Sequence, residues 1–190
     1  VKSRISVDSG DSSLMRVVER LEDELTAQSS RSFKGTTGLH HGSLILTAAH
    51  FHRDKLVLVR DFSRARHERF TLDLAIAINA WCWDVSPRQR GGPAGLYSPI
   101  RLKALLTAYC HHRQLYETDY LQLADDMRLT ALTTAISRIK NYELSEESGQ
   151  LFEDYRHYTA RLEALEEKRA LELLAMTGLL RVNRPIVPRA

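Results

Sequence analysis

Two neighbouring stretches decide the fold: LHHGSLILTAAHF at residues 39–51 and KLVLVRDFSRAR at residues 55–66. Each contains a short apolar run, and the polar residues 52–54 separate the two runs. Short apolar runs that flank a polar turn predict a small β-hairpin over residues 44–60. The rest of the chain has helical patterns, so the expected fold class is mainly α with a short β-hairpin.

Two helices are predicted next to the hairpin. Before it, apolar residues recur every three or four positions and predict an amphipathic helix that begins near residues 11–13, followed by a turn-rich connection at 30–38. After it, LDLAIAINAWCWDV at residues 72–85 is apolar almost all round, which predicts a helix buried on most of its surface. Asp73 lies at the start of this helix, where a carboxylate can accept hydrogen bonds from unpaired backbone N–H groups.

The second half of the chain predicts a loop and three more helices. Residues 86–99 contain three prolines and three glycines, the composition of a mobile loop. Apolar spacing predicts helices over residues 100–113, 119–142 and 150–180, with Gly178 as a stop signal. The tail 181–190 is expected to be extended. With no repeat and no convincing linker, residues 1–190 are expected to form a single domain.

Composition restricts the class of protein. The 190 residues carry a net charge of +3, a basic excess too slight to indicate a nucleic-acid partner. Cys82 and Cys110 lie in apolar helical patterns without metal-ligand spacing, so both are expected to be buried free thiols in a reducing compartment. No apolar run approaches the ~18 residues of a membrane span. A cytoplasmic protein without a membrane partner is therefore expected.

The segment His41-Gly42-Ser43-Leu44-Ile45-Leu46-Thr47-Ala48, followed by Asp61-Phe62, resembles the H-G-D-L-x-x-x-N loop and D-F dipeptide of kinase-like enzymes. We call these residues the loop frame. The run from Asp73 to Cys82 resembles the matching segment of type II homoserine kinases, in the aminoglycoside phosphotransferase and choline kinase superfamily; the shared residues are Asp73-Leu74-Ala75-Ile76, Asn79 and Trp81-Cys82. Residues 104–123 and 138–142 continue the likeness, which extends to about residue 165.

The resemblance implies the large C-terminal lobe of a protein-kinase-like fold. The small lobe would precede residue 1, and the 190 residues contain no glycine-rich phosphate loop or lysine-bearing strand of the kinase type. The resemblance assigns the position of the catalytic aspartate to Ser43, which is expected to be inactive, and that of a magnesium-binding asparagine to Ala48. It implies that Asp61 is a weak metal and cofactor ligand, that His41 supports the loop, and that Asp73 ties the loop to the helix start.

Two functions follow from different classes. The favoured one is a non-catalytic kinase-lobe remnant that acts as a binding or self-association module, with no cofactor. The alternative is a phosphotransferase resembling homoserine kinase, which would use ATP and magnesium to phosphorylate an amino-alcohol hydroxyl and would be completed by a missing small lobe or another chain. For Asp61-Phe62, a purely structural role at a strand end is favoured over metal binding.

Basic and histidine residues near the hairpin suggest further sites. The cluster of Arg60, Arg64, Arg66 and Arg69 is interpreted as a solvated loop in preference to a phosphate- or nucleic-acid-binding patch. A zinc site built from His40, His41, His50 and His52 is chemically reasonable, but scattered loop histidines are favoured. Without a small lobe, the hairpin 44–59 is expected to be exposed and to be covered by a protein partner or a second copy.

Overall fold

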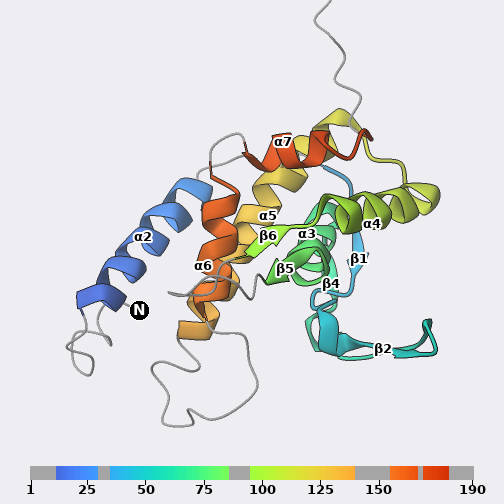
Figure 1. Ribbon diagram of the computed structural model, residues 1–190, viewed down its shortest axis with the longest axis horizontal. Helices are drawn as coiled ribbons and strands as arrows, with labels where there is room; N and C mark the ends of the chain where they lie inside the picture. Colours follow the sequence, from blue (N-terminus) through green and yellow to red (C-terminus); the bar gives the residue numbers. More distant parts are fainter. Residues whose placement is uncertain (1–11, 30–34, 86–94, 140–154, 167–168, 180–190) are drawn as a thin grey trace, which may run out of the picture.

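The computed structural model describes residues 12–29, 35–85, 95–139, 155–166 and 169–179 (Figure 1). The helices are α2 (Ser12–Ser29), α3 (Phe70–Trp81), α4 (Pro99–His112), α5 (Glu117–Arg138), α6 (Tyr155–Ala164) and α7 (Arg169–Ala175), with the 3₁₀ turns η1 (Leu46–Ala48) and η2 (Phe62–Arg64). The strands are β1 (Thr37–His40), β2 (Ala49–His52), β3 (Lys55–Val59), β4 (Arg66–Arg69), β5 (Trp83–Val85) and β6 (Gly95–Tyr97).

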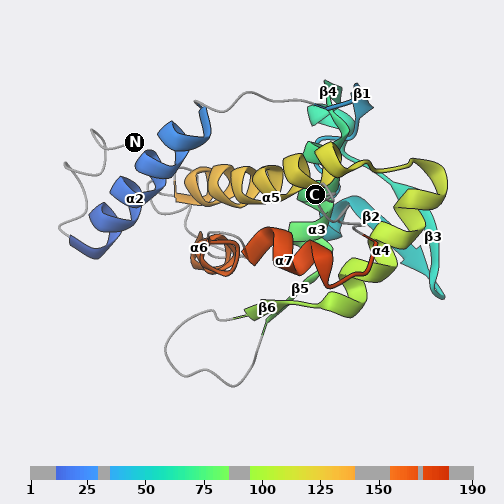
Figure 2. The same cartoon turned by 90° about the horizontal axis from the view of Figure 1, so that it is seen from above.

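Helix α5 is the centre of the helical body, with α3, α6, α7 and α2 packed against it (Figure 2). One apolar cluster joins α3, α4, α5 and α7 and includes Ile78, Leu106 and Met127. A second cluster joins α2, α5 and α6 and includes Leu21 and Leu132. The amphipathic helix expected to begin near residues 11–13 is confirmed, since its Leu21 is buried against α5.

The buried helix after the hairpin is confirmed, but its predicted end at residue 85 is wrong. Helix α3 ends at Trp81, and residues 83–85 form strand β5, which pairs with β6. A continuous apolar run fits a buried strand as well as a buried helix, so periodicity could not separate the two. Cys82 makes the change of direction: its N–H donates to the Ile78 carbonyl, and its own carbonyl accepts from Ser98 N–H at 2.7 Å. Strand β6 also shortens the loop expected at 86–99, of which residues 86–94 lie outside the described residues.

The predicted hairpin is confirmed as β2 and β3, but its predicted start at residue 44 is wrong, because Leu46–Ala48 form η1 and the first strand begins at Ala49. The hairpin extends away from the helical body (Figure 1). Arg53 and Asp54 both have positive φ, 46° and 63°, as a two-residue type I′ turn requires. The pairing is irregular: Leu58 lies opposite His50 and Leu56 opposite Phe51, so Val57 has no cross-strand partner. This extra residue is a β-bulge, which locally disrupts the ladder of hydrogen bonds.

A further sheet lies in segments where no strand was predicted. Strand β1 falls partly within the turn-rich connection predicted at 30–38, and it pairs with β4 in the segment interpreted as a solvated loop. Gly38 permits the close approach of α3, because a Cβ at this position would lie 2.1 Å from the Phe70 ring. Residues 30–34 lie outside the described residues. The polar composition of both strands explains why neither matched an apolar strand pattern.

The helix predicted over residues 150–180 is wrong as a single element. It is two helices, α6 and α7, and residues 150–154, 167–168 and 180 of the predicted range lie outside the described residues. Leu162 of α6 packs in the cluster beneath α2, whereas Leu174 of α7 packs in the cluster with α3 and α4. Two directions let each helix bury its apolar face in a different cluster. Gly178, with φ at 72°, follows α7 as the stop signal predicted.

The helices predicted at 100–113 and 119–142 are confirmed as α4 and α5, although residues 140–142 and the tail 181–190 lie outside the described residues. Cys82 is a buried free thiol as predicted, but Cys110 is only half-buried at the edge of the core, where its Sγ lies 4.0 Å from the Tyr120 hydroxyl. None of the described helices combines the length and hydropathy needed to span a bilayer.

Candidate functional site

The loop frame is held by one carboxylate. Asp73 Oδ2 accepts a hydrogen bond from His41 N–H at 3.1 Å, and its Oδ1 accepts one from Gly42 N–H at 2.8 Å. The buried His40 ring also lies beside this carboxylate, with Nδ1 3.3 Å from Oδ1. Asp73 therefore ties the loop to the first turn of α3, and this predicted role is confirmed.

Gly42 gives the loop its turn. Its φ is 77°, in the left-handed region that glycine adopts without steric cost. A Cβ at this position would lie 2.3 Å from the backbone carbonyl oxygen of Arg64. The segment after Asp61 therefore packs directly against the loop backbone, and both conformation and space require glycine here.

His41 joins the loop to the segment that carries Asp61. Its Nδ1 accepts from Ser43 N–H at 3.2 Å, and its Nε2 lies 3.0 Å from the Arg60 carbonyl oxygen. A nitrogen that accepts cannot carry a proton, and a nitrogen beside a carbonyl oxygen must donate, so the arrangement fits the neutral Nε2–H tautomer. The ring also contacts Phe62, with centroids 4.5 Å apart. The ring thus contacts the loop through Nδ1 and the segment before Asp61 through Nε2.

Asp61 has a left-handed backbone conformation, with φ 66° and ψ 61°. Aspartate tolerates this region better than most residues, and such conformations are frequent at functional sites. The Ser63 hydroxyl donates to Oδ1 at 2.6 Å, and this bond lowers the pKa of the exposed Asp61 carboxyl below its usual value. Asp61 is therefore a negative charge held in a fixed orientation at the surface.

Two pockets meet at Asp61. The first, of about 520 Å³, lies between the loop frame and helices α3 and α5; the residues at its rim and walls include Ser43, Asp61, Arg64, Arg66, Thr133 and Arg138. The second, of about 360 Å³, is lined by Thr47, Ala48, Arg60 and Asp61. Ser43 and Ala48 thus line different pockets, and Asp61 lines both.

The side chains of Ser43 and Ala48 have limited chemistry. The half-buried Ser43 contributes a hydroxyl to the larger pocket. Ala48 is 2% exposed, and its backbone is engaged: its N–H donates to the Ile45 carbonyl and its carbonyl accepts from Arg60 N–H at 2.9 Å. The smaller pocket therefore contains one carboxylate and no second acidic or amide side chain.

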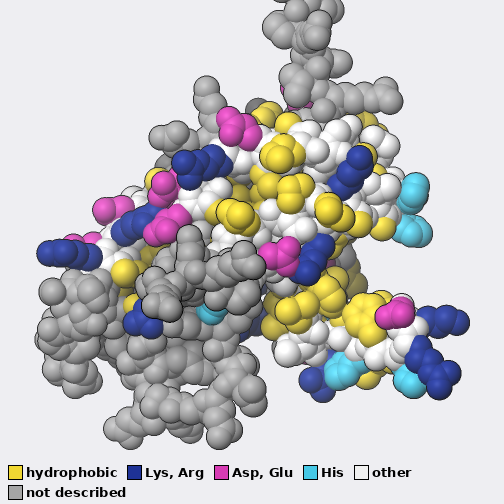
Figure 3. All heavy atoms as spheres, viewed as in Figure 1, with side chains coloured by type: hydrophobic (Ala, Val, Ile, Leu, Met, Phe, Trp, Pro, Cys, Tyr) yellow, Lys and Arg dark blue, Asp and Glu magenta, His cyan; other side chains and the backbone are white. Residues whose placement is uncertain are grey.

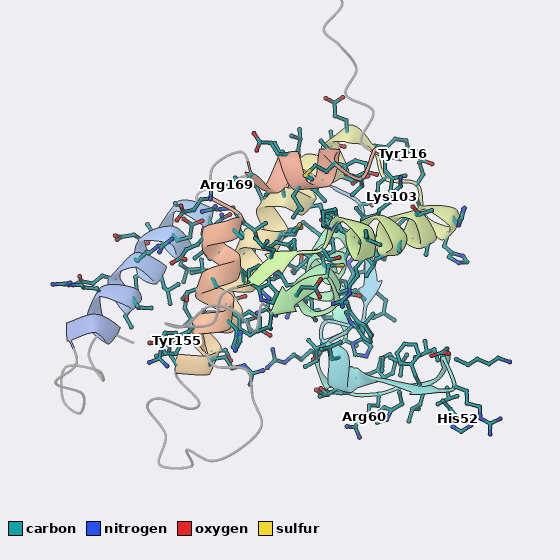
Figure 4. All side chains as sticks on the ribbon, viewed as in Figure 1. His52, Arg60, Lys103, Tyr116, Tyr155 and Arg169 are labelled. Atoms are coloured by element: carbon teal, nitrogen blue, oxygen red, sulfur yellow. The ribbon has the colours of Figure 1, made fainter. Side chains whose placement is uncertain are left out.

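The arginine cluster does not act as one solvated loop. Arg69 lies in β4 with its side chain 11% exposed, and its Nη2 is 2.9 Å from Oδ1 of the fully buried Asp126. The interpretation is wrong for Arg69, because a buried carboxylate requires a partner of opposite charge. Arg64 and Arg66 are exposed at the larger pocket, and Arg60 donates through Nε to the Thr47 carbonyl. Arg60 is labelled on the hairpin in Figure 4.

Two buried polar networks were not predicted. Thr71 and Gln122 join Arg69 on the carboxylate of Asp126, at 2.6 Å and 3.1 Å. In the other, the Asn79 amide donates to the Met127 carbonyl and accepts from Tyr97, whose pKa is raised by burial. Arg161, 1% exposed, donates to the Asn79 carbonyl at 2.8 Å and lies over the rings of Tyr158 and Trp83. The bonds Thr71–Asp126, Tyr97–Asn79 and Arg161–Asn79 join residues 55, 18 and 82 positions apart, so no local pattern indicated them.

The histidines near the hairpin have separate environments. His40 is buried on β1, His41 lies in the loop frame, and His50 and His52 lie on β2. Within the described residues, no group of three or more His, Cys, Asp or Glu side chains has an arrangement that could hold a metal ion.

Comparison with known proteins relates the chain to homoserine kinases. No protein-family model matches it. Homoserine kinase from Cupriavidus necator is 32% identical over 91 residues, which cover 48% of this chain and 25% of that protein. Homoserine kinase from Nitrobacter winogradskyi is 30% identical over 120 residues, 63% of this chain and 34% of that protein, and the one from Janthinobacterium is 26% identical over 125 residues, 66% and 37%. The chain thus spans between 25% and 37% of the length of these relatives, and the similarity indicates a homoserine-kinase-like relationship for this part.

Proposed function

We propose that this chain is a large lobe of the protein-kinase-like fold, of the aminoglycoside phosphotransferase type, that keeps the loop frame without its phosphoryl-transfer chemistry and acts as a binding or self-association module. One observation supports the proposal: Asp73 holds the loop frame through the N–H groups of His41 and Gly42. At the positions that the resemblance gives to the catalytic carboxylate and the metal-binding asparagine, this frame has Ser43 and Ala48. In this proposal residues 1–190 form a single domain.

Ser43 is unsuited to act as a catalytic base. Phosphoryl transfer to a hydroxyl depends on a carboxylate that positions the acceptor and accepts its proton. The Ser43 hydroxyl does not ionise near neutral pH, and a positioned general base is typically worth about 10²–10⁴ in rate. The half-buried Ser43 offers hydrogen bonding to a ligand in the larger pocket and no proton acceptor of suitable strength.

The smaller pocket is a poor site for magnesium. Magnesium prefers near-octahedral oxygen ligands and is usually held by one or two carboxylates together with substrate phosphates. The residues of the smaller pocket do not fit this ion well, because Ala48 provides no ligand atom and Asp61 is a single exposed carboxylate. Asp61 is therefore at most a weak metal and cofactor ligand, and no cofactor is expected.

Residues 44–59 expose several large apolar side chains. Leu46, Phe51, Leu56, Val57 and Leu58 are each more than half exposed, as expected for a surface that another molecule covers. Exposed apolar residues gathered on one element usually mark an interaction site. The proposed module therefore binds through residues 44–59, either a protein partner or a second copy.

A second candidate function is phosphotransfer from ATP and magnesium to an amino-alcohol hydroxyl. Two observations favour it: Asp61 is ionised and oriented between the two pockets, and the curated relatives carry the name homoserine kinase. This function would need further residues, from this polypeptide or another, to hold the nucleotide phosphates.

A turnover assay separates the two candidates. The chain is incubated with magnesium, ATP and homoserine, and ADP release is compared with a protein-free blank; release at the blank rate is expected. Turnover above the blank by the unmodified chain refutes the proposal. The double variant Ser43→Asp/Ala48→Asn tests the loop frame itself, because it should give manganese-induced relaxation of the Asp61 amide signal in NMR spectra that the wild type lacks. The same spectrum for both proteins contradicts the assignment of position 48 as a metal position.

A further inference from the structure

The hairpin β2–β3 presents apolar side chains on both of its faces. Leu56, Val57 and Leu58 are consecutive, and each is 52–61% exposed, although alternating residues of a strand point to opposite faces. The bulge at Val57 removes this residue from the ladder, and Phe51 on the neighbouring strand is 55% exposed. Phe51 contacts the ring of Trp81 in α3, with centroids 5.9 Å apart, but more than half of each of these apolar side chains stays exposed. The hairpin projects from the helical body (Figure 1).

The hairpin also has free strand edges. Among the described residues β2 and β3 pair only with each other, so each strand leaves one row of backbone N–H and C=O groups without a strand partner. Unpaired edges are templates for the addition of another strand, and main-chain hydrogen bonds then supply much of the affinity. The shape of this surface therefore fits an extended segment with apolar side chains at alternate positions.

Charge decides which kind of segment fits. Residues 49–60 contain three cationic side chains, Arg53, Lys55 and Arg60, against the single carboxylate of Asp54, a difference of 3 − 1 = +2. In the part of the chain that the structure describes, no carboxylate forms an ion pair with Arg53 or Lys55. Figure 3 shows Lys, Arg and His side chains gathered at the outer end of the hairpin around its apolar middle. His52 and Arg60 lie on the side away from the helical body (Figure 4).

We propose that the hairpin Ala49–Arg60 docks an acidic, extended segment of a partner protein, with alternating apolar and Asp or Glu residues, by strand addition. The apolar residues of that segment would cover Phe51 and Leu56–Leu58, and its carboxylates would lie beside Lys55 and Arg53. A second copy of this chain fits less well, since it would bring two hairpins of the same sign of charge together. The inference rests on the proposed binding function and names the chemistry of its partner.

Fluorescence anisotropy with three labelled peptides of about ten residues tests the inference on the full chain. The probes are alternating Val and Glu, alternating Val and Lys, and the Val–Glu composition arranged in two blocks. Binding of the alternating acidic probe about tenfold tighter than either other probe is expected, with weakening as salt is raised. Equal binding of the acidic and basic probes, or no binding of the acidic one, overturns the inference.

Variants locate the binding. Val57→Asp, at a position outside the ladder, should abolish binding of the acidic probe, and Lys55→Glu should weaken it several-fold. Leu96→Asp is the matched control, because Leu96 is 73% exposed on β6, outside the hairpin, and this variant should bind as the wild type does. Unchanged binding by Val57→Asp overturns the inference, as does a wild-type dimer in sedimentation that Val57→Asp dissociates. Neither of these two results bears on turnover, which the ADP-release assay measures separately. The non-catalytic part of the proposed function can therefore stand if the acidic partner is refuted.

Discussion

Removal of the Asp73 carboxylate should release the loop frame from α3. Asp73→Ala deletes the acceptor of two backbone N–H groups, those of His41 and Gly42, at 3.1 Å and 2.8 Å. Hydrogen bonds to a charged group contribute about 1.5–3 kcal/mol each, and the lower value is appropriate because the Asp73 side chain is 21% exposed. The expected loss is about 3 kcal/mol for Asp73→Ala and about half of that for Asp73→Asn, whose amide oxygen still accepts one bond.

Urea unfolding followed by circular dichroism measures this loss. For a chain of this size, about 3 kcal/mol corresponds to a decrease of roughly 6–12 °C in Tm. Asp84→Ala is the matched control: Asp84 pairs with Arg101 at 2.6 Å, but both side chains are about half exposed, so the loss should stay below ~1 kcal/mol. In addition, the amide protons of His41 and Gly42 should exchange faster in Asp73→Asn. Equal stabilities of Asp73→Ala and Asp84→Ala would refute the role of Asp73 in holding the loop frame.

Two further predictions concern the glycines and the buried thiol. Gly42 and Gly178 have similar φ values, 77° and 72°. A Cβ at Gly42 would lie 2.3 Å from a backbone carbonyl oxygen, whereas a Cβ at Gly178 would have no atom within 4 Å. Gly178→Ala should cost about 1 kcal/mol of unfolding free energy and Gly42→Ala clearly more, and equal losses in urea unfolding would contradict the close approach. Burial raises the pKa of Cys82 from 9.0 to about 12, so above pH 9 the unfolded chain loses this proton while the folded chain keeps it. Stability should then fall from pH 9 toward pH 12 by up to ~1.4 kcal/mol per pH unit from this group, and Cys82→Ala should reduce the slope of unfolding free energy against pH; an unchanged slope would refute the assignment.

Local sequence patterns were sufficient to predict the elements whose apolar and turn residues lie within a few positions of one another. The hairpin is an example, because apolar runs flank a turn at Arg53 and Asp54. The strand at residues 83–85 was missed because Trp83 and Val85 continue an apolar run that also fits a buried helix. The single helix predicted at 150–180 failed because the direction of each half depends on which cluster receives its apolar face.

For the candidate site, the resemblance to kinase-like loops gave the positions of His41, Asp61 and Asp73, and the structure brings these positions together. It could not give the tautomer of His41 or the bond from Ser63 that orients Asp61, since both depend on atomic contacts. The pairing of Arg69 with a buried carboxylate 57 residues later was equally inaccessible, because nothing in a local pattern specifies long-range ion pairs.

Asp73 holds the loop frame through backbone N–H groups and not through side chains. The two N–H groups belong to His41 and Gly42, so the side chain at position 43 can change without loosening the loop. Position 48 differs, because Ala48 is 2% exposed and a larger side chain there would have to fit the smaller pocket. Selection on stability alone would therefore preserve Asp73, Gly42 and a small residue at position 48 more strictly than the residue at position 43.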